Sequence, residues 1–150
     1  MKLIKNSMIL ASLLMLGTLS SFKPVPGGDS FQIYLNGKLV LDKALYKNKD
    51  VQSLEFVQAS SSDKVEVYYS HCGKTGTARS ITIKDDGQKT LKTWSYADGG
   101  KNMSLQLQDL RNLQTSYKES HIGLFYSSKE LPSGQQLAEI SITGKSLASR

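Results

Sequence analysis

The chain of 150 residues contains a single cysteine, Cys72, and only two histidines, His71 and His121. One cysteine cannot form an internal disulfide, so the fold has to draw its stability from a core. A lone thiol can be buried and inert, reactive, or paired with another molecule. Because free cysteine packs as a small hydrophobe, burial of Cys72 is the favoured interpretation.

Long apolar runs are missing beyond the start of the chain. Residues 1–20 contain Lys2 and Lys5, an apolar run over residues 8–16 and then small residues. This layout is typical of a cleavable signal peptide, and the run is too short to span a bilayer, which takes about 20 residues. No cysteine follows the run, which argues against a lipid anchor. We therefore expect an exported protein, periplasmic or secreted, with no transmembrane segment.

Clustered positive charge is absent as well. The net charge is +6, and it falls to +4 if Lys2 and Lys5 are removed with the signal peptide. Lysines elsewhere alternate with acids, as in Lys84-Asp85-Asp86, which is typical of a solvated surface. Nucleic-acid binding needs basic residues gathered on one face. We expect no nucleic-acid partner, and no motif indicates a cofactor.

Long helical patterns are also lacking. Residues 21–30 are rich in Pro and Gly and predict a tether, and residues 31–150 suffice for one domain with a core. Only residues 108–117 carry helical spacing, through Leu110 and Leu113, and they predict a turn or short helix. Without a helical crossover, parallel strand pairs are not expected.

The domain is instead dominated by apolar residues that alternate with polar ones, the pattern of half-buried strands. Asn36-Gly37 predicts a tight hairpin turn within residues 31–42, because both residues tolerate positive φ. The other predicted strands are 53–59, 64–72, 79–84, 91–96, 103–107, 122–126 and 138–142. Eight or nine short antiparallel strands predict an all-β fold, an antiparallel β-sandwich, with a closed barrel as the alternative.

The stretch from Tyr68 to Ile83 contains Gly73-Lys74-Thr75, which looks like the end of a phosphate-binding loop. That motif needs a glycine where Tyr68 stands, and a helix after it where a strand is predicted. The motif is therefore rejected. A weaker hypothesis keeps the loop as an anion site formed by Lys74, Arg79 and backbone amides.

Cys72 is the one candidate nucleophile of the cysteine–histidine type. His71 is adjacent, but neighbours on a strand point to opposite faces, and His121 is the other possible base. A metal site formed by these three residues lacks the usual ligand spacing. We assign no catalytic residue and expect no metal.

Trp94 and Tyr96 lie two apart on one predicted strand, so both project to the same face. Exposed, they would form a platform for sugar rings. The opposite face is weakly apolar, which favours their burial. The sequence thus favours a non-catalytic exported binding or structural domain whose partner is a protein or a glycan. The alternative is a small exported enzyme that uses Cys72 with a histidine.

Overall fold

The computed structural model describes residues 28–144, which form nine strands and one helix. The strands are β1 Ser30–Leu35, β2 Lys38–Ala44, β3 Gln52–Gln58, β4 Lys64–Ser70, β5 Arg79–Lys84, β6 Thr90–Tyr96, β7 Asn102–Gln106, β8 Ile122–Ser127 and β9 Gln135–Gly144, and the helix is α2 Leu107–Ser116. The prediction of a mostly β chain is confirmed. The expected signal peptide, and the expected tether up to residue 27, lie outside the described residues.

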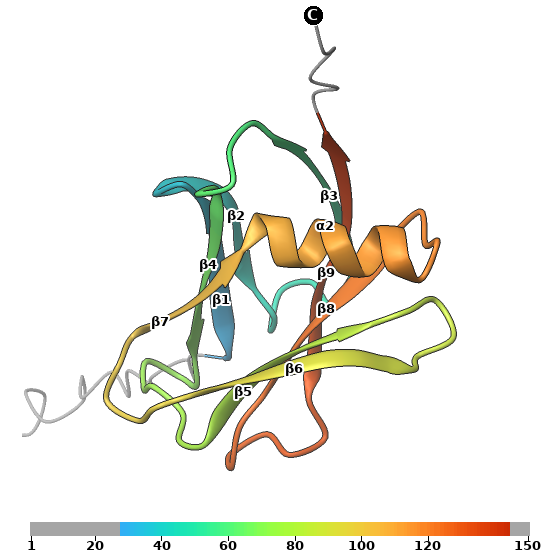
Figure 1. Ribbon diagram of the computed structural model, residues 1–150. Coiled ribbons are helices and arrows are strands. Elements are labelled where there is room, and N and C mark those ends of the chain that lie inside the picture. Colours follow the sequence, from blue (N-terminus) through green and yellow to red (C-terminus); the bar gives the residue numbers. More distant parts are fainter. Residues whose placement is uncertain (1–27, 145–150) are drawn as a thin grey trace, which may run out of the picture.

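The strands form two sheets that enclose one core (Figure 1). One sheet has the order β2-β1-β4-β7, and the other has the order β3-β9-β8-β5-β6. Completely buried side chains come from both sheets: Ile33, Val65, Val67 and Met103 from the first, and Ile81, Ile83, Leu124 and Ile140 from the second. Each such side chain stabilises the fold by roughly 1.5–3 kcal/mol through burial. The core is therefore the main source of stability, as the shortage of cysteine requires.

The hairpin turn at Asn36 and Gly37 is confirmed. Both residues have positive φ, 51° and 79°, as a primed turn between twisted strands requires. The turn joins β1 to β2 and thereby places Gln32 opposite Asp42.

The expectation that all strands pair antiparallel is wrong for one pair. β3 and β9 run parallel, from Gln52 opposite Ala138 to Gln58 opposite Gly144. The need for a helical crossover applies to parallel strands that follow each other closely in the chain. Here five strands and the helix lie between the two, so the polypeptide returns in the parallel sense without a dedicated crossover.

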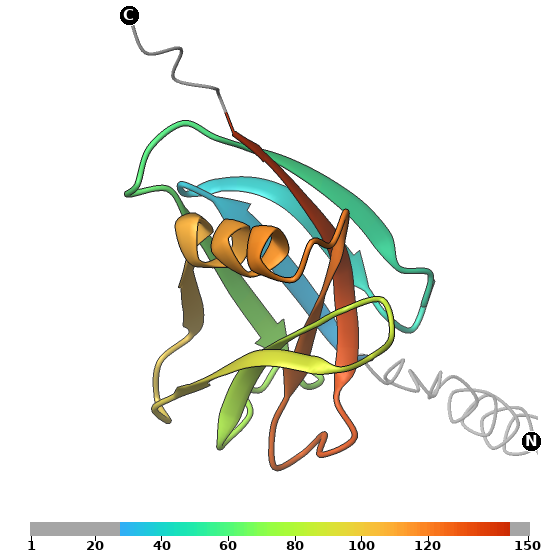
Figure 2. The same ribbon diagram turned by 45° about the vertical axis from the view of Figure 1, so that its right-hand side comes forward.

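Helix α2 begins at Leu107, a residue that the alternation pattern had assigned to a strand. Figures 1 and 2 show the helix crossing from β7 toward β9, where it contacts both sheets. The helix buries its own residues Leu107 and Leu110, and its Leu113 packs against the core. The helix therefore covers the opening between the two sheets on this side. Within residues 28–144, no helix combines the length and apolar character needed to cross a membrane.

Gln114 attaches the helix to β9 through two hydrogen bonds. The backbone N–H of Ile142 donates to Gln114 Oε1 at 2.9 Å, and Gln114 Nε2 donates to the carbonyl of Ile142 at 3.3 Å. Strand β8 pairs with β9 only as far as Ile140, so Ile142 has no strand partner on that side. The side-chain amide takes the place of the missing strand.

We predict that Gln114→Leu lowers the free energy of unfolding by about 1–3 kcal/mol, because it leaves two backbone groups of a part-buried strand without partners. Thr115→Leu, at the neighbouring exposed helix position, should change stability by less than about 0.5 kcal/mol. Urea denaturation measures both. Equal stability of the two variants would mean that apolar contacts alone hold the helix.

Candidate functional site

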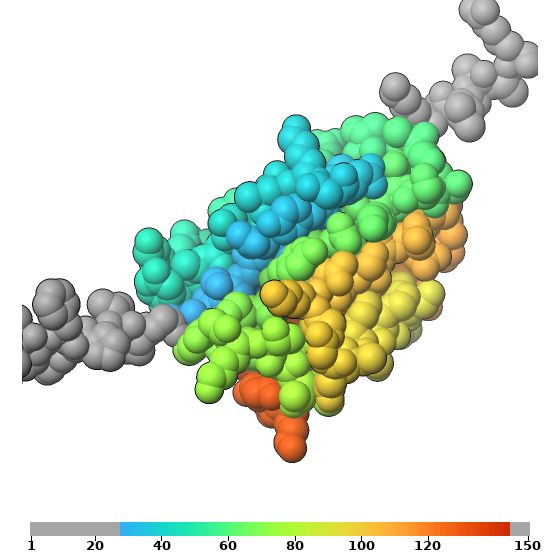
Figure 3. All heavy atoms as spheres, turned by 90° about the vertical axis from the view of Figure 1, so that its left-hand side faces the viewer, coloured from blue at the N-terminus to red at the C-terminus, as the bar shows by residue number. Residues whose placement is uncertain are grey.

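The outward face of the four-stranded sheet presents a row of polar and aromatic side chains across its strands. The register places Asp42 opposite Gln32, Gln32 opposite Tyr68, and Tyr68 opposite Asn102. Opposite residues in antiparallel strands project to the same face. Their sequence neighbours point into the core, so the alternation of β1 and β4 turns this row toward solvent. Figure 3 shows the face, with β2, β1, β4 and β7 side by side.

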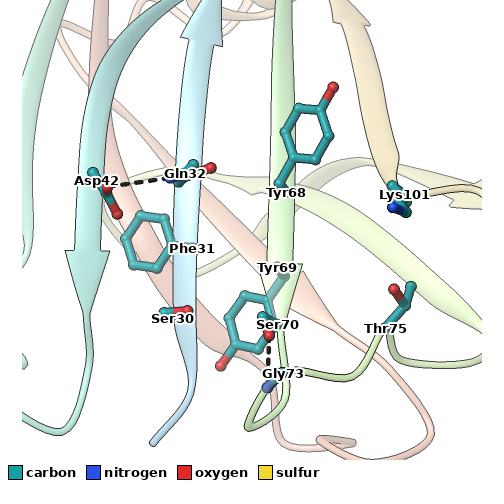
Figure 4. Close-up of a pocket in the computed structure, with 10 residues that line it drawn as sticks. All are labelled: Ser30, Phe31, Gln32, Asp42, Tyr68, Tyr69, Ser70, Gly73, Thr75 and Lys101. Carbon is teal, nitrogen blue, oxygen red and sulfur yellow. Dashed lines mark hydrogen bonds between the residues drawn. The ribbon is translucent and has the colours of Figure 1, made fainter. Parts of the chain in front are cut away.

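A cavity of about 280 Å³ opens on this face. Its lining comes from β1, β2 and β4, from the loop after β4 and from the residue before β7: Ser30, Phe31, Gln32, Asp42, Tyr68, Tyr69, Ser70, Gly73, Thr75 and Lys101. Figure 4 shows Asp42 and Lys101 on opposite sides, with Tyr68 between them. The volume is near the lower end of the range for small-molecule sites, roughly 300–1,000 Å³. A site of this size holds a small ring or one end of a longer ligand.

A chain of hydrogen bonds orients the polar groups on one side of the cavity. The Tyr34 hydroxyl donates to Gln32 Oε1 at 3.0 Å, and Gln32 Nε2 donates to Asp42 Oδ2 at 3.1 Å (Figure 4 shows the second bond). These bonds fix which way the Gln32 amide faces. Asp42 is exposed, and a carboxylate has room for several donors, so it can accept further bonds from a ligand.

Tyr68 supplies the aromatic surface of the site. Its ring lies 5.3 Å from that of Tyr34, measured between centroids, in an edge-to-face arrangement at 66°. Both side chains are half-buried, so each ring supports the other while a part of it faces solvent. Neither tyrosine was selected from the sequence as a site residue. The alternation of their strands was the signal that could have found them, because it turns both outward.

The loop after β4 begins with a two-residue turn. Cys72 and Gly73 have positive φ, 51° and 89°, and His71 and Lys74 pair across them as an isolated bridge. The stretch that looked like half a phosphate loop is therefore a tight primed turn. The backbone N–H of Gly73 donates to Ser70 Oγ at 2.9 Å, which places the turn at the edge of the cavity (Figure 4).

The expectation that Cys72 is buried is wrong. The residue is exposed, because it occupies the tip of this turn and not the strand that was predicted to continue through it. Its thiol lies 3.9 Å from Asp29 Oδ1. Among the described residues, no hydrogen bond joins the thiol to His71 or His121.

His71 lies instead at the centre of a polar cluster. Its Nδ1 is 3.2 Å from Asp29 Oδ2, and its Nε2 is 2.9 Å from the Tyr126 hydroxyl and 3.1 Å from Ser128 Oγ. The Tyr69 hydroxyl also donates to Asp29 Oδ2, at 2.9 Å. Burial raises the pKa of both Tyr69 and Tyr126, so both phenols stay protonated and able to donate.

The connection from Asp29 through His71 to Ser128 has the bonding order of a serine-hydrolase triad. A nucleophile must reach substrate, however, and Ser128 is buried. Its hydroxyl also accepts the backbone N–H of Leu131 at 3.2 Å, which stabilises the turn after β8. The cluster therefore acts as a structural tie between β1, β4 and β8.

His121 is far from this cluster. It precedes β8, whereas Ser128 follows the end of that strand, and a strand of this length spans about 20 Å. The proposed set of His71, Cys72 and His121 is thus not assembled. In residues 28–144, no group of three or more His, Cys, Asp or Glu side chains is placed to hold a metal ion.

The two cations of the anion hypothesis lie in different environments. Lys74 is exposed, but Arg79 is only 1% exposed, because it shares the inward face of β5 with Ile81 and Ile83. The Arg79 guanidinium donates to the backbone carbonyls of Ala97 at 2.9 Å and Lys101 at 3.4 Å. Arg79 therefore holds the connection between β6 and β7, and the expected surface site with Lys74 is wrong.

Trp94 and Tyr96 lie on edge strand β6, half-buried and packed against the core. The Tyr96 hydroxyl donates to the backbone carbonyl of Ser104 at 2.9 Å, and burial raises the pKa of Tyr96 to about 12. The Lys92 ammonium sits over the Trp94 ring, 4.6 Å from its centroid. The structure thus places this pair at the margin of the core, not on an open platform.

Comparison with known proteins assigns no family, since no family model, no curated protein and no solved structure matches the chain. The candidate site therefore rests on its own geometry.

Glu130 clamps the loop that borders the cavity. Its carboxylate accepts the backbone N–H of Thr77 at 2.9 Å and the Thr77 hydroxyl at 2.8 Å. These bonds lower the pKa of Glu130 from 4.5 to about 2, and the bond from the Thr77 backbone has the largest effect. The bonds favour the charged form, so the clamp weakens when the carboxylate is protonated.

We predict a pH-dependent effect of Glu130→Gln on melting temperature. The pKa of Glu130 is lower in the folded state than in the unfolded state. The carboxylate therefore stabilises the fold fully above its ordinary pKa of 4.5, and this stabilisation is lost as the pH falls from about 4.5 toward about 2. Wild type should melt above the variant at pH 6, and the difference should vanish near pH 2. Glu55→Gln, at an exposed position of β3, should show no such trend. A constant difference across this range would contradict the clamp.

We also predict that a thiol reagent modifies one group per native chain without denaturant, because Cys72 is exposed. Mass spectrometry measures the added mass, and Cys72→Ser should take up none while it retains the wild-type circular dichroism spectrum. Modification that begins only in denaturant would place the thiol inside the fold.

Proposed function

We propose that this protein is a non-catalytic binding domain that recognises a glycan through the outward face of the four-stranded sheet. The observation that carries the proposal is the half-buried Tyr68 ring beside the cavity, in one row with Asp42, Gln32 and Asn102. A sugar ring offers an apolar face to an aromatic side chain and hydroxyls around its rim. Carboxylates accept bonds from such hydroxyls, and amides both donate and accept.

The surface composition favours a glycan over a protein partner. A stable protein interface covers roughly 800 Å² on each side and has an apolar centre. Of the large apolar side chains that are exposed, Leu39 is opposite Tyr34 on this sheet, whereas Tyr46, Val51, Val57 and Tyr117 lie outside its four strands. The row itself is polar apart from its tyrosine. It suits a small hydrated ligand better than a second protein surface.

The proposed setting is outside the cytoplasm, in the periplasm or the surrounding medium. The charged start, short apolar run and small residues of segment 1–20 support cleavage and export. Two sheets around one core support the interpretation of the domain as a β-sandwich. Domains of this architecture can leave one sheet face open to a ligand without loss of the core.

The binding proposal is preferred to an enzyme that uses Cys72. Both ring nitrogens of His71 face other partners, Asp29 on one side and Tyr126 with Ser128 on the other. A thiol nucleophile needs a base within hydrogen-bond reach. The arrangement of His71 supports a structural role.

We predict that Tyr68→Ala weakens binding to the best ligand of an oligosaccharide panel by about tenfold or more, as loss of a central aromatic contact does. Tyr117→Ala, which removes an exposed tyrosine beyond the end of α2, is the matched control and should bind as wild type does. Isothermal titration calorimetry measures both, on folded protein checked by circular dichroism. No binding by wild type to any member of the panel, or equal affinities of the two variants, would contradict the proposal.

A further inference from the structure

The cavity on the outward face carries opposite charges at its two ends. The Asp42 carboxylate lies on the outermost strand, β2, and Lys101 immediately precedes β7 at the other edge of the sheet. Figure 4 shows the two side chains on either side of Tyr68. Three strand spacings of about 4.8 Å separate the edges, so the backbones that carry the two charges lie roughly 14 Å apart. A ligand across the strands meets a different charge at each end.

At this end of the cavity, the Lys101 ammonium has no carboxylate of residues 28–144 within ion-pair distance. Lys64 and Lys92 each have a carboxylate within 4.0 Å, whereas no ion pair joins Lys101 to a described residue. Lys101 is exposed, so its ammonium is accessible to a ligand.

Arg79 adds to the positive charge at this end. It is 1% exposed, forms no ion pair within the described part of the chain, and its Nε lacks a hydrogen-bond partner there. Its guanidinium bonds the Lys101 carbonyl at 3.4 Å, so the buried charge lies close to the backbone of Lys101. A buried charge is screened by solvent less than a surface charge, and its field reaches the neighbouring surface.

We propose that the ligand is an acidic glycan, bound with a sugar carboxylate at Lys101 and with uncharged hydroxyls at Gln32 and Asp42. This inference rests on the proposed function and adds the chemical class of the ligand and the direction in which it lies across the sheet. A carboxylate at the opposite end would face Asp42 and be repelled, so the two charges specify one direction of binding. Lys101 is a specificity residue, and Tyr68 supplies contact area that acidic and neutral sugars share.

The test uses three oligosaccharides of equal length, one neutral, one built of uronic acids and one built of amino sugars, titrated into the full chain at low ionic strength. Wild type should bind the uronic-acid oligomer about two- to fivefold more tightly than the neutral one, the range of one exposed ion pair. The preference should shrink as salt is added, because exposed charges are screened.

Lys101→Gln should bring the affinity for the uronic-acid oligomer down to the affinity that the same variant has for the neutral oligomer. Lys74→Gln is the matched control, because Lys74 is exposed on the adjacent turn but does not line the cavity. It should keep the wild-type preference.

Three results would overturn the inference and leave the proposed function standing: equal binding of acidic and neutral oligomers, a preference for the amino-sugar oligomer, or a preference that survives Lys101→Gln. Failure of all three oligomers to bind would instead overturn the proposed function, and this inference with it. Binding of a mixed-charge peptide in place of any sugar would have the same effect.

Discussion

The stacked contact between Tyr69 and Tyr126 is the interaction on which the rest of the structure depends. The rings lie 4.0 Å apart and 12° from parallel, and they join β4 of one sheet to β8 of the other. Both hydroxyls bond into the cluster around His71, so the contact buries aromatic area and satisfies its polar groups together. Because neighbours on a strand face opposite ways, a Tyr69 fixed inward holds Tyr68 outward. Strand β4 thus contributes to both the core and the candidate site.

The loop between β4 and β5 is shaped by the same cluster. A side-chain carbon at Gly76 would stand 2.5 Å from the Tyr126 hydroxyl and 2.9 Å from His71 Nε2, so only glycine lets the loop close over the two sheets. Glu130 secures the next residue, Thr77, through two hydrogen bonds. The border of the cavity is thus built from groups that also hold the sheets together, which gives a ligand a rigid edge to contact.

The local sequence pattern was sufficient to predict most of the strands, the Asn36-Gly37 turn and the inward face of β4, because alternation depends only on neighbouring residues. The local pattern was insufficient where contacts between residues far apart in the sequence determine the direction of a side chain. Arg79 follows a loop and is a residue type that is usually exposed. Its position in the alternation of β5 nevertheless turns its side chain inward, where it bonds backbone carbonyls of the connection between β6 and β7. Cys72 adopts a left-handed turn conformation that usually selects Asn or Gly, so no propensity indicated it. The outward direction of Tyr34 and Tyr68 could be predicted from the alternation of their strands. The alignment of Tyr68 with Asp42, Gln32 and Asn102 could not, because it depends on the register of four strands.

The parallel pairing of β3 with β9 has a consequence for how the chain acquires its structure. Each pair in this ladder joins residues about 86 positions apart, from Gln52 with Ala138 onward. Contacts at such separation carry a large loop-closure cost and slow the search for the native state. The second sheet cannot be completed until nearly the whole described chain has emerged from the machinery that makes or moves it. Under the export proposed above, this late pairing would keep β3 and β9 apart during passage.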